Sequence, residues 1–188
     1  MLTKAYAIAH KDEIIADMKA GKLFIYPTDT IYGIGCNASN GEAVDKIRTL
    51  KKRDTNPFSV IAPSQKWIES TCIIPPMAKE WMKKLPGPYT LILPLKDASA
   101  ISPKVVEGSV NLGIRVPNNW FMEFVQEANI AFVTTSANIS GRATMTDFYS
   151  LDPFIKEGVD YVIYEGALNK KASTIVNLTK DKPEIITR

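Results

Sequence analysis

Short apolar segments alternate with amphipathic segments along the whole chain. Apolar, β-prone runs predict strands, whereas apolar residues spaced three or four positions apart predict helices. The expected strands span residues 23–26, 58–62, 89–95, 111–116, 130–134, 160–164, 174–178 and 184–187. The expected helices span residues 11–20 and 40–50, a short stretch after Ser64, another after Pro76, and a segment from Asn118. Strands separated by helices indicate one layered α/β or α+β domain covering residues 1–188.

A glycine-rich segment follows the first expected strand. Residues 33–38 read Gly-Ile-Gly-Cys-Asn-Ala, which matches the G-x-G-x-x-A pattern of dinucleotide-binding domains. The acidic residue expected after the next strand is absent, because that strand runs into Pro63. We therefore interpret Gly33 and Gly35 as parts of a tight turn with positive φ angles.

Composition excludes several classes of protein. The chain has 188 residues, of which 45% are hydrophobic and 23% charged, so it is neither disordered nor collagen-like. A chain of this length can form a real core without disulfides or structural metals. The net charge is +3, which is too small to indicate a nucleic-acid-binding protein.

Cysteine and histidine are too few for two common kinds of site. Cys36, Cys72 and His10 stand far apart, so neither a zinc cluster nor a histidine-based nucleophilic triad is expected. No leader sequence and no apolar run of about 18 residues is present. We expect a soluble, cytoplasmic protein with reduced thiols and no membrane partner, in which the glycosylation-like matches at Asn138 and Asn177 arose by chance.

The segment from Tyr26 to Gly33 is unusually polar for the end of a strand. It reads Tyr-Pro-Thr-Asp-Thr-Ile-Tyr-Gly. These side chains can satisfy backbone groups of a local turn. They can equally form the wall of a pocket that recognises a small hydroxylated substrate, and spacing alone does not separate the two interpretations.

Five basic residues occupy eight positions at the end of the helix expected over 40–50: Lys46, Arg48, Lys51, Lys52 and Arg53. A solvated helix face explains such a run, because cations are favoured at a helix C-terminus. Lys51 and Arg53, however, continue into the following loop. Long basic side chains at that junction suit an anionic ligand such as phosphate.

Arg115 is the most informative single residue. Side chains alternate along a strand, so Asn111, Gly113 and Arg115 share the face opposite the apolar even-numbered positions. An arginine near a glycine in a half-buried strand favours a ligand whose carboxylate or phosphate pairs with the guanidinium. A structural salt bridge to an acidic neighbour is the competing interpretation.

Two further segments are rich in small hydrogen-bonding side chains. Residues 134–141 read Thr-Thr-Ser-Ala-Asn-Ile-Ser-Gly and follow an expected strand. Such loops form backbone nests for anions or bind nucleotides, but they are also ordinary polar connections. Ser173 and Thr174 repeat the pattern with lower specificity.

Six segments occur in the order typical of one known family. They are residues 26–35, Lys51-x-Arg53 with 57–60, then 86–93, 113–117, 136–141 and 173–176. Together they resemble the YrdC-type family, the threonylcarbamoyl-AMP synthases, over about residues 23–188. Six matches in order are far more specific than any one of them.

The resemblance implies an α/β fold in which a twisted mixed sheet, flanked by helices, surrounds a large basic cavity. It implies a nucleotidyltransferase that makes threonylcarbamoyl-AMP and pyrophosphate from L-threonine, ATP and bicarbonate or CO2. Mg2+ is the implied cofactor, held mostly by phosphate and water. Positioning and charge stabilisation suffice for such chemistry without a histidine base. The product would pass to a threonylcarbamoyl-transferase complex that modifies tRNA.

The resemblance also assigns roles to individual residues. The expected L-threonine contacts are Thr30, Arg115, Thr135 and Ser173, with Arg115 on the carboxylate. The expected catalytic residues form a K-x-R and an S-x-N pair: Lys51, Arg53, Ser136 and Asn138. The expected ATP contacts are Lys51, Arg53, Asn111, Ala137, Asn138 and Arg188. No protein side chain is expected to bind the metal.

The K-x-R and S-x-N pairs favour the synthase over the YciO-like branch of the family, which looks degenerate at both. The sequence departs from the family pattern at Asn177, at residues 118–120, and after Arg188, where longer members carry an extension domain. Two alternatives stay open. One is a non-catalytic binder of double-stranded RNA or tRNA, with a steep salt dependence. The other is a domain that handles carbamoyl-adenylate, as in hydrogenase-maturation carbamoyltransferases.

Overall fold

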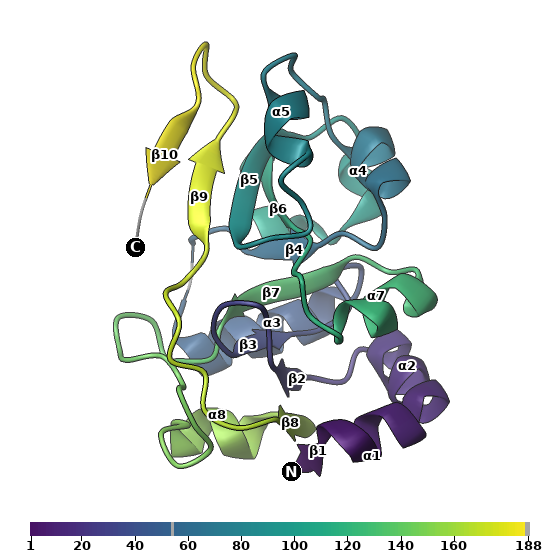
Figure 1. The fold of residues 1–188 in the computed structure, drawn as a ribbon, viewed down its shortest axis with the longest axis vertical. Helices are drawn as coiled ribbons and strands as arrows, with labels where there is room; N and C mark the ends of the chain where they lie inside the picture. The colour runs from purple at the N-terminus through teal and green to yellow at the C-terminus, as the bar shows by residue number, and fades with distance from the viewer. Residues whose placement is uncertain (54, 187–188) are drawn as a thin grey trace.

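The computed structural model describes residues 1–53 and 55–186, in which one long mixed sheet runs through the molecule between helices (Figure 1). The strand order is β1-β8-β2-β3-β7-β4-β6-β5-β9-β10. The strands are β1 (Leu2–Thr3), β2 (Phe24–Tyr26), β3 (Gly33–Gly35), β4 (Ser59–Ile61), β5 (Tyr89–Pro94), β6 (Asn111–Arg115), β7 (Phe132–Ser136), β8 (Tyr161–Tyr164), β9 (Thr174–Asn177) and β10 (Glu184–Ile186). The helices are α1 (Lys4–Ala9), α2 (Lys11–Ala20), α3 (Gly41–Lys51), α4 (Gln65–Thr71), α5 (Ala78–Met82), α6 (Pro103–Val106), α7 (Met122–Ala128) and α8 (Pro153–Gly158), with a 3-10 turn at Ala98–Ala100. The expected α/β class with a mixed sheet is therefore confirmed.

Every strand expected from the sequence is present, shifted by at most two residues. The expected helix ends are confirmed by their caps: Asn40 accepts a hydrogen bond from the Ala43 N–H, and Gly21 has a φ of 89°. The helix expected from Asn118 begins at Met122 instead. The short elements β1, α1, α6 and α8 were not predicted, because each is too brief to show a clear period.

The tight turn expected at Gly33 and Gly35 is wrong. These residues form β3, which pairs antiparallel with both β2 and β7. Neither glycine has a positive φ. A Cβ on Gly35 would lie 1.9 Å from the Val133 carbonyl oxygen, so this position needs glycine because of close approach between strands.

Gly35→Ala is expected to destabilise the fold by about 1–3 kcal/mol or more, because the added methyl overpacks the sheet. Urea unfolding measures this change. Gly108→Ala is the matched control, since a Cβ there meets no atom within 4 Å and strains only a backbone with φ of 77°. Equal losses of stability in the two variants would contradict the packing role of Gly35.

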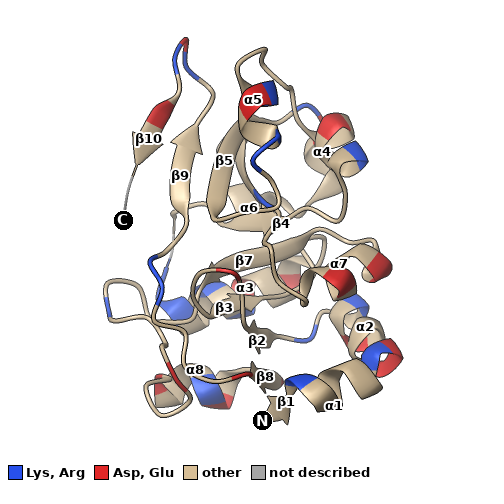
Figure 2. Ribbon diagram, in the orientation of Figure 1, with Lys and Arg blue, Asp and Glu red and all other residues tan. Residues whose placement is uncertain are grey.

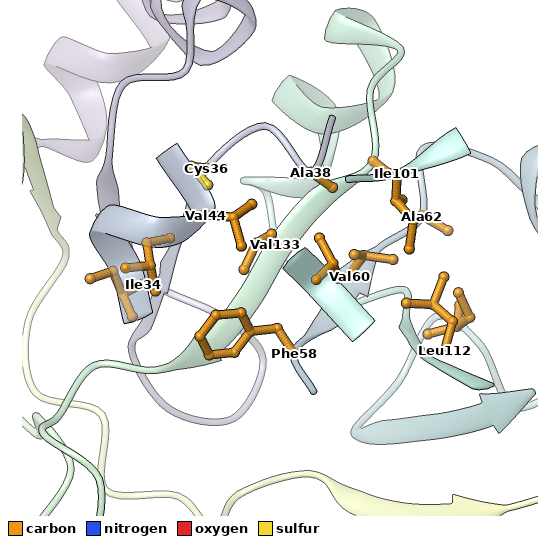
Figure 3. Close-up of a cluster of buried hydrophobic side chains, with 14 of the residues drawn as sticks. Ile34, Cys36, Ala38, Val44, Phe58, Val60, Ala62, Ile101, Leu112 and Val133 are labelled. Atoms are coloured by element: carbon orange, nitrogen blue, oxygen red, sulfur yellow. The ribbon is translucent and has the colours of Figure 1, made fainter. Parts of the chain in front are cut away.

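The two faces of the sheet bury different clusters. On one face, Val60, Val133 and Leu112 pack with helix α3 in an aliphatic core (Figure 3). On the other face, an aromatic cluster includes Tyr26 and Phe121, whose rings stack with centroids 4.4 Å apart. Along β7, Phe132 belongs to this aromatic cluster, and Thr134, two residues later on the same face, lines a cavity.

Charged residues lie mainly on helices and connecting segments, with both signs interspersed (Figure 2). Among the residues that the structure describes, no helix is long and apolar enough to span a membrane. Cys36 and Cys72 are free and buried. Burial raises the pKa of the Cys72 thiol to about 11, so this thiol is protonated at neutral pH.

Candidate active site

A cavity of about 310 Å³ opens where β3, β4, β5 and β7 meet the segment before β9. Its size falls within the range of small-molecule sites. Strand register builds its floor, because Ser59 of β4 pairs with Gly113 on one side and Thr134 on the other. Hydroxyl groups dominate the lining, from Thr30, Tyr32, Ser59, Thr90, Thr134, Thr135, Ser136, Thr144 and Ser173.

Two guanidinium groups provide the charge in this lining. Within residues 1–53 and 55–186, the charged residues that face the cavity are Arg53 and Arg115. The described lining is thus rich in hydroxyls and modest in charge. The large basic cavity implied by the resemblance stays a prediction, and Arg188, expected to contribute to it, lies outside the described residues.

Arg115, at the end of β6, makes the ion pair of the competing interpretation and also lines the cavity. Its Nη2 donates to Asp29 Oδ1 at 2.7 Å and to Thr30 Oγ1 at 3.3 Å. Its Nε is buried, with no acceptor in the described part of the chain. Burial lowers the pKa of Arg115 while Asp29 raises it, and the guanidinium stays protonated. The two interpretations of Arg115 are therefore compatible, because both bonds use Nη2 and leave Nη1 for a ligand.

The hydroxyl of Thr30 has a defined polarity. Thr28 Oγ1 donates its single hydrogen to the Ile31 carbonyl at 2.7 Å. Thr30 must therefore be the donor in the 3.0 Å contact between the Thr28 and Thr30 hydroxyls. Since Arg115 occupies one lone pair of the Thr30 oxygen, the remaining lone pair can accept a hydrogen from a ligand.

Lys51 lies behind the cavity wall and does not line it. Its side chain is buried, and Nζ donates to the carbonyls of Ser136 (2.6 Å) and Asn138 (2.8 Å) and to Asn138 Oδ1 (3.3 Å). The Lys51 carbonyl also accepts from the Ser140 N–H at 2.9 Å. Lys51 thus holds the S-x-N loop in place, and its expected contact with phosphate stays a prediction.

The rest of the basic run divides into buried and exposed residues. Arg48 is buried, donates to the Lys104 carbonyl at 2.6 Å and pairs with Glu107 at 3.1 Å. Arg53 lines the cavity while donating to the Pro57 carbonyl at 2.6 Å. Lys46 and Lys52 are exposed, as a solvated helix face predicts.

Comparison with known proteins places the chain in a family. A family model for Sua5, YciO and YrdC, described as telomere recombination, matches residues 16–188. The chain belongs to this family. A Methanocaldococcus jannaschii protein provisionally named threonylcarbamoyl-AMP synthase is 38% identical over 86% of this chain and 77% of its own length. A Bacillus subtilis threonylcarbamoyl-AMP synthase is 36% identical over 77% of this chain.

The structural relatives in the Sua5/YciO/YrdC family cover nearly the whole chain. The crystal structure of P. abyssi Sua5 complexed with L-threonine superposes with a TM-score of 0.86 and 25% identity, over 98% of this chain. Escherichia coli YciO, an uncharacterized protein, is 26% identical over 93% of this chain. The chain spans 55% of the Sua5 chain and 40% of the B. subtilis synthase.

The family residues expected from the sequence separate into two groups. The cavity brings together Thr30, Arg53, Arg115, Thr135, Ser136 and Ser173. The residues placed outside its described lining are Lys51, Asn111, Ala137 and Asn138. Asn138 still contacts the site indirectly, because its Oδ1 accepts from Ser136 Oγ at 2.5 Å.

Sequence reasoning assigned no role to four hydroxyl residues of this cavity, Ser59, Thr90, Thr134 and Thr144, although Thr134 belongs to the hydroxyl-rich segment 134–141. Thr90 Oγ1 lies 2.8 Å from Ser173 Oγ, so the two form a buried hydroxyl pair. Ser59 and Thr90 are polar residues beside apolar strand residues. That contrast was the available signal.

Proposed function

We propose that this protein is an L-threonylcarbamoyladenylate synthase, which uses L-threonine, ATP and bicarbonate or CO2. One observation supports the proposal most strongly. A buried guanidinium whose Nη1 has no partner in the described chain stands beside a hydroxyl with an unused acceptor, in a cavity lined by hydroxyl groups. That combination suits the carboxylate, amine and side-chain hydroxyl of a small hydroxylated amino acid. Relatives named for this activity point the same way.

The polarity of the site orients the amino acid. Arg115 binds the carboxylate through its remaining donors, as a guanidinium prefers. The Thr30 oxygen accepts an N–H of the amine, which directs the nitrogen lone pair away from Thr30. The Ser173–Thr90 pair receives the side-chain hydroxyl, and Thr135 completes the pocket. This arrangement selects threonine over apolar amino acids of the same size.

Two bonds form in the proposed reaction. The amine nitrogen attacks the carbon of CO2 and releases a proton to solvent, or it attacks bicarbonate and its proton leaves with the displaced hydroxide as water. Either path gives a carbamate. A carbamate oxygen then attacks the α-phosphorus of ATP, and the bond to the bridging oxygen breaks to release pyrophosphate. We place Arg53 and the backbone of the S-x-N loop beside the phosphates, where they stabilise developing charge.

The donor set of the cavity suits a metal that arrives with the nucleotide. Hydroxyls rather than carboxylates line the described wall, and no cluster of three metal-binding side chains occurs among the described residues. Mg2+ typically keeps water and phosphate ligands in such sites. Bound in this way, it would neutralise charge between the phosphates.

The product would serve tRNA threonylcarbamoylation in the cytoplasm, through a transferase complex that accepts the acyl-adenylate. The test is incubation with ATP, Mg2+, labelled bicarbonate and L-threonine, and the expected result is threonine-dependent pyrophosphate and a labelled adenylate. Absence of both would overturn the proposal. Turnover with carbamoyl phosphate in place of threonine and bicarbonate would favour a carbamoyl-adenylate domain instead. Tight, salt-sensitive binding of RNA without turnover would favour an RNA-binding protein.

A further inference from the structure

Asp29 contacts Arg115 but does not line the cavity. We infer that Asp29 is a positioning residue for L-threonine: its carboxylate holds the Arg115 guanidinium in the orientation that receives the substrate carboxylate. The inference rests on the proposed function, because it concerns how the same site grips its amino acid.

Asp29 connects the segments that surround Arg115. One carboxylate oxygen accepts from Arg115 Nη2 at 2.7 Å, and the other accepts from the Asn118 N–H at 3.1 Å. Its carbonyl accepts from Lys170 Nζ at 3.2 Å, in the segment that leads to cavity residue Ser173. The Asn118 N–H therefore holds the carboxylate, and the carboxylate in turn holds one end of the guanidinium.

Different nitrogen atoms of Arg115 serve the contact with the protein and the contact with the substrate. Nη2 is occupied by Asp29 and Thr30, whereas Nη1 has no hydrogen-bond partner within the described chain and is the donor left for a ligand. The side chains of Arg115 and Asp29 are 8% and 9% exposed, so water cannot readily replace either partner in the hydrogen bond between them. While Asp29 holds Nη2, the guanidinium keeps its orientation and directs Nη1 toward the substrate carboxylate. Without that anchor, other side-chain rotamers compete with this orientation.

Asp29→Asn tests the inference, because it keeps the shape and removes the charge. We expect the Kd for L-threonine, measured by calorimetry, to rise about 10- to 100-fold, the factor that a hydrogen bond to a charged group supplies. The KM for ATP should stay within about twofold, since the bonds of Asp29 run to Arg115, Asn118 and Lys170 rather than to the expected phosphate contacts. Asp45→Asn is the matched control: Asp45 pairs with Lys104 at the surface and does not line the cavity.

A double-mutant cycle separates positioning from general structural support. In an Arg115→Ala background, Asp29→Asn should leave the remaining threonine affinity unchanged, because the group it positions is absent. A further loss of affinity in that background would overturn the inference. So would an unchanged threonine Kd in folded Asp29→Asn protein when the wild type binds. If the wild type itself binds no L-threonine, the proposed function fails and the inference fails with it.

Discussion

Arg115→Ala is expected to weaken L-threonine binding strongly while ATP binding survives. Truncating one partner of a buried, hydrogen-bonded charge pair typically weakens a complex by about 2–5 kcal/mol, which is roughly 30- to several-thousand-fold. Arg115 supplies the charge nearest the proposed carboxylate position, and Arg53 is the other charged residue in the described lining. Titration calorimetry with each substrate, and threonine-dependent pyrophosphate release, measure the two effects separately.

Stability must be measured in the same variant, because Arg115→Ala leaves Asp29 without its ionic partner. The side chain of Asp29 is 9% exposed, and breaking a buried pair from one side costs about 3–5 kcal/mol. Arg115→Ala with Asp29→Asn should recover part of this loss without recovering threonine binding. Threonine binding of normal strength in folded Arg115→Ala protein would contradict the role of Arg115. Loss of the fold in both variants would indicate that the salt bridge is its main contribution.

The location of Arg115 could be predicted from the sequence, because alternation along a strand is a local property. Leu112 and Ile114 do enter the aliphatic core, and Arg115 does line the cavity. Its partner could not be predicted in this way. Asp29 is 86 residues away, and the contact depends on the packing of a loop against the end of β6. Local pattern contains no information about such a pairing.

The glycine and lysine assignments show the same limit. A G-x-G pattern indicates two positions that do not tolerate a side chain. A turn with positive φ and close packing against a neighbouring strand both produce this pattern. Only the pairing of β3 with β7 shows that Gly35 serves packing. For Lys51, helical period placed the residue at the end of α3. Its burial against Ser136 and Asn138 follows from where β7 ends, which is a long-range property.

Lys51→Met is expected to weaken both the fold and the activity. Methionine fills a similar volume but donates no hydrogen bond, so the carbonyls of Ser136 and Asn138 lose a shared donor. The Ser136 carbonyl still accepts from the Asn138 N–H at 2.9 Å, whereas the Asn138 carbonyl loses its donor, and a buried acceptor left without a partner costs about 1–3 kcal/mol. The loop behind Ser136 would then shift, and a displacement of about 1 Å in a positioned group can lower kcat/KM roughly 100-fold. Lys46→Met, on the exposed side of the same helix, is the matched control.

Hydrogen exchange distinguishes this loop-holding role from the phosphate contact that the family resemblance implies. If Lys51 holds the loop, Lys51→Met should lower the free energy of unfolding and speed exchange at the Ser140 amide, which bonds to the Lys51 carbonyl. If Lys51 instead binds phosphate, the KM for ATP should rise while stability and exchange stay as in the wild type. Lys51→Arg sharpens the comparison: it keeps the charge, but its planar donors do not converge on three oxygens as an ammonium does. Relative to the wild type, Lys51→Arg should therefore lose free energy of unfolding but little ATP affinity. A loss of ATP affinity without a loss of stability would contradict the loop-holding role.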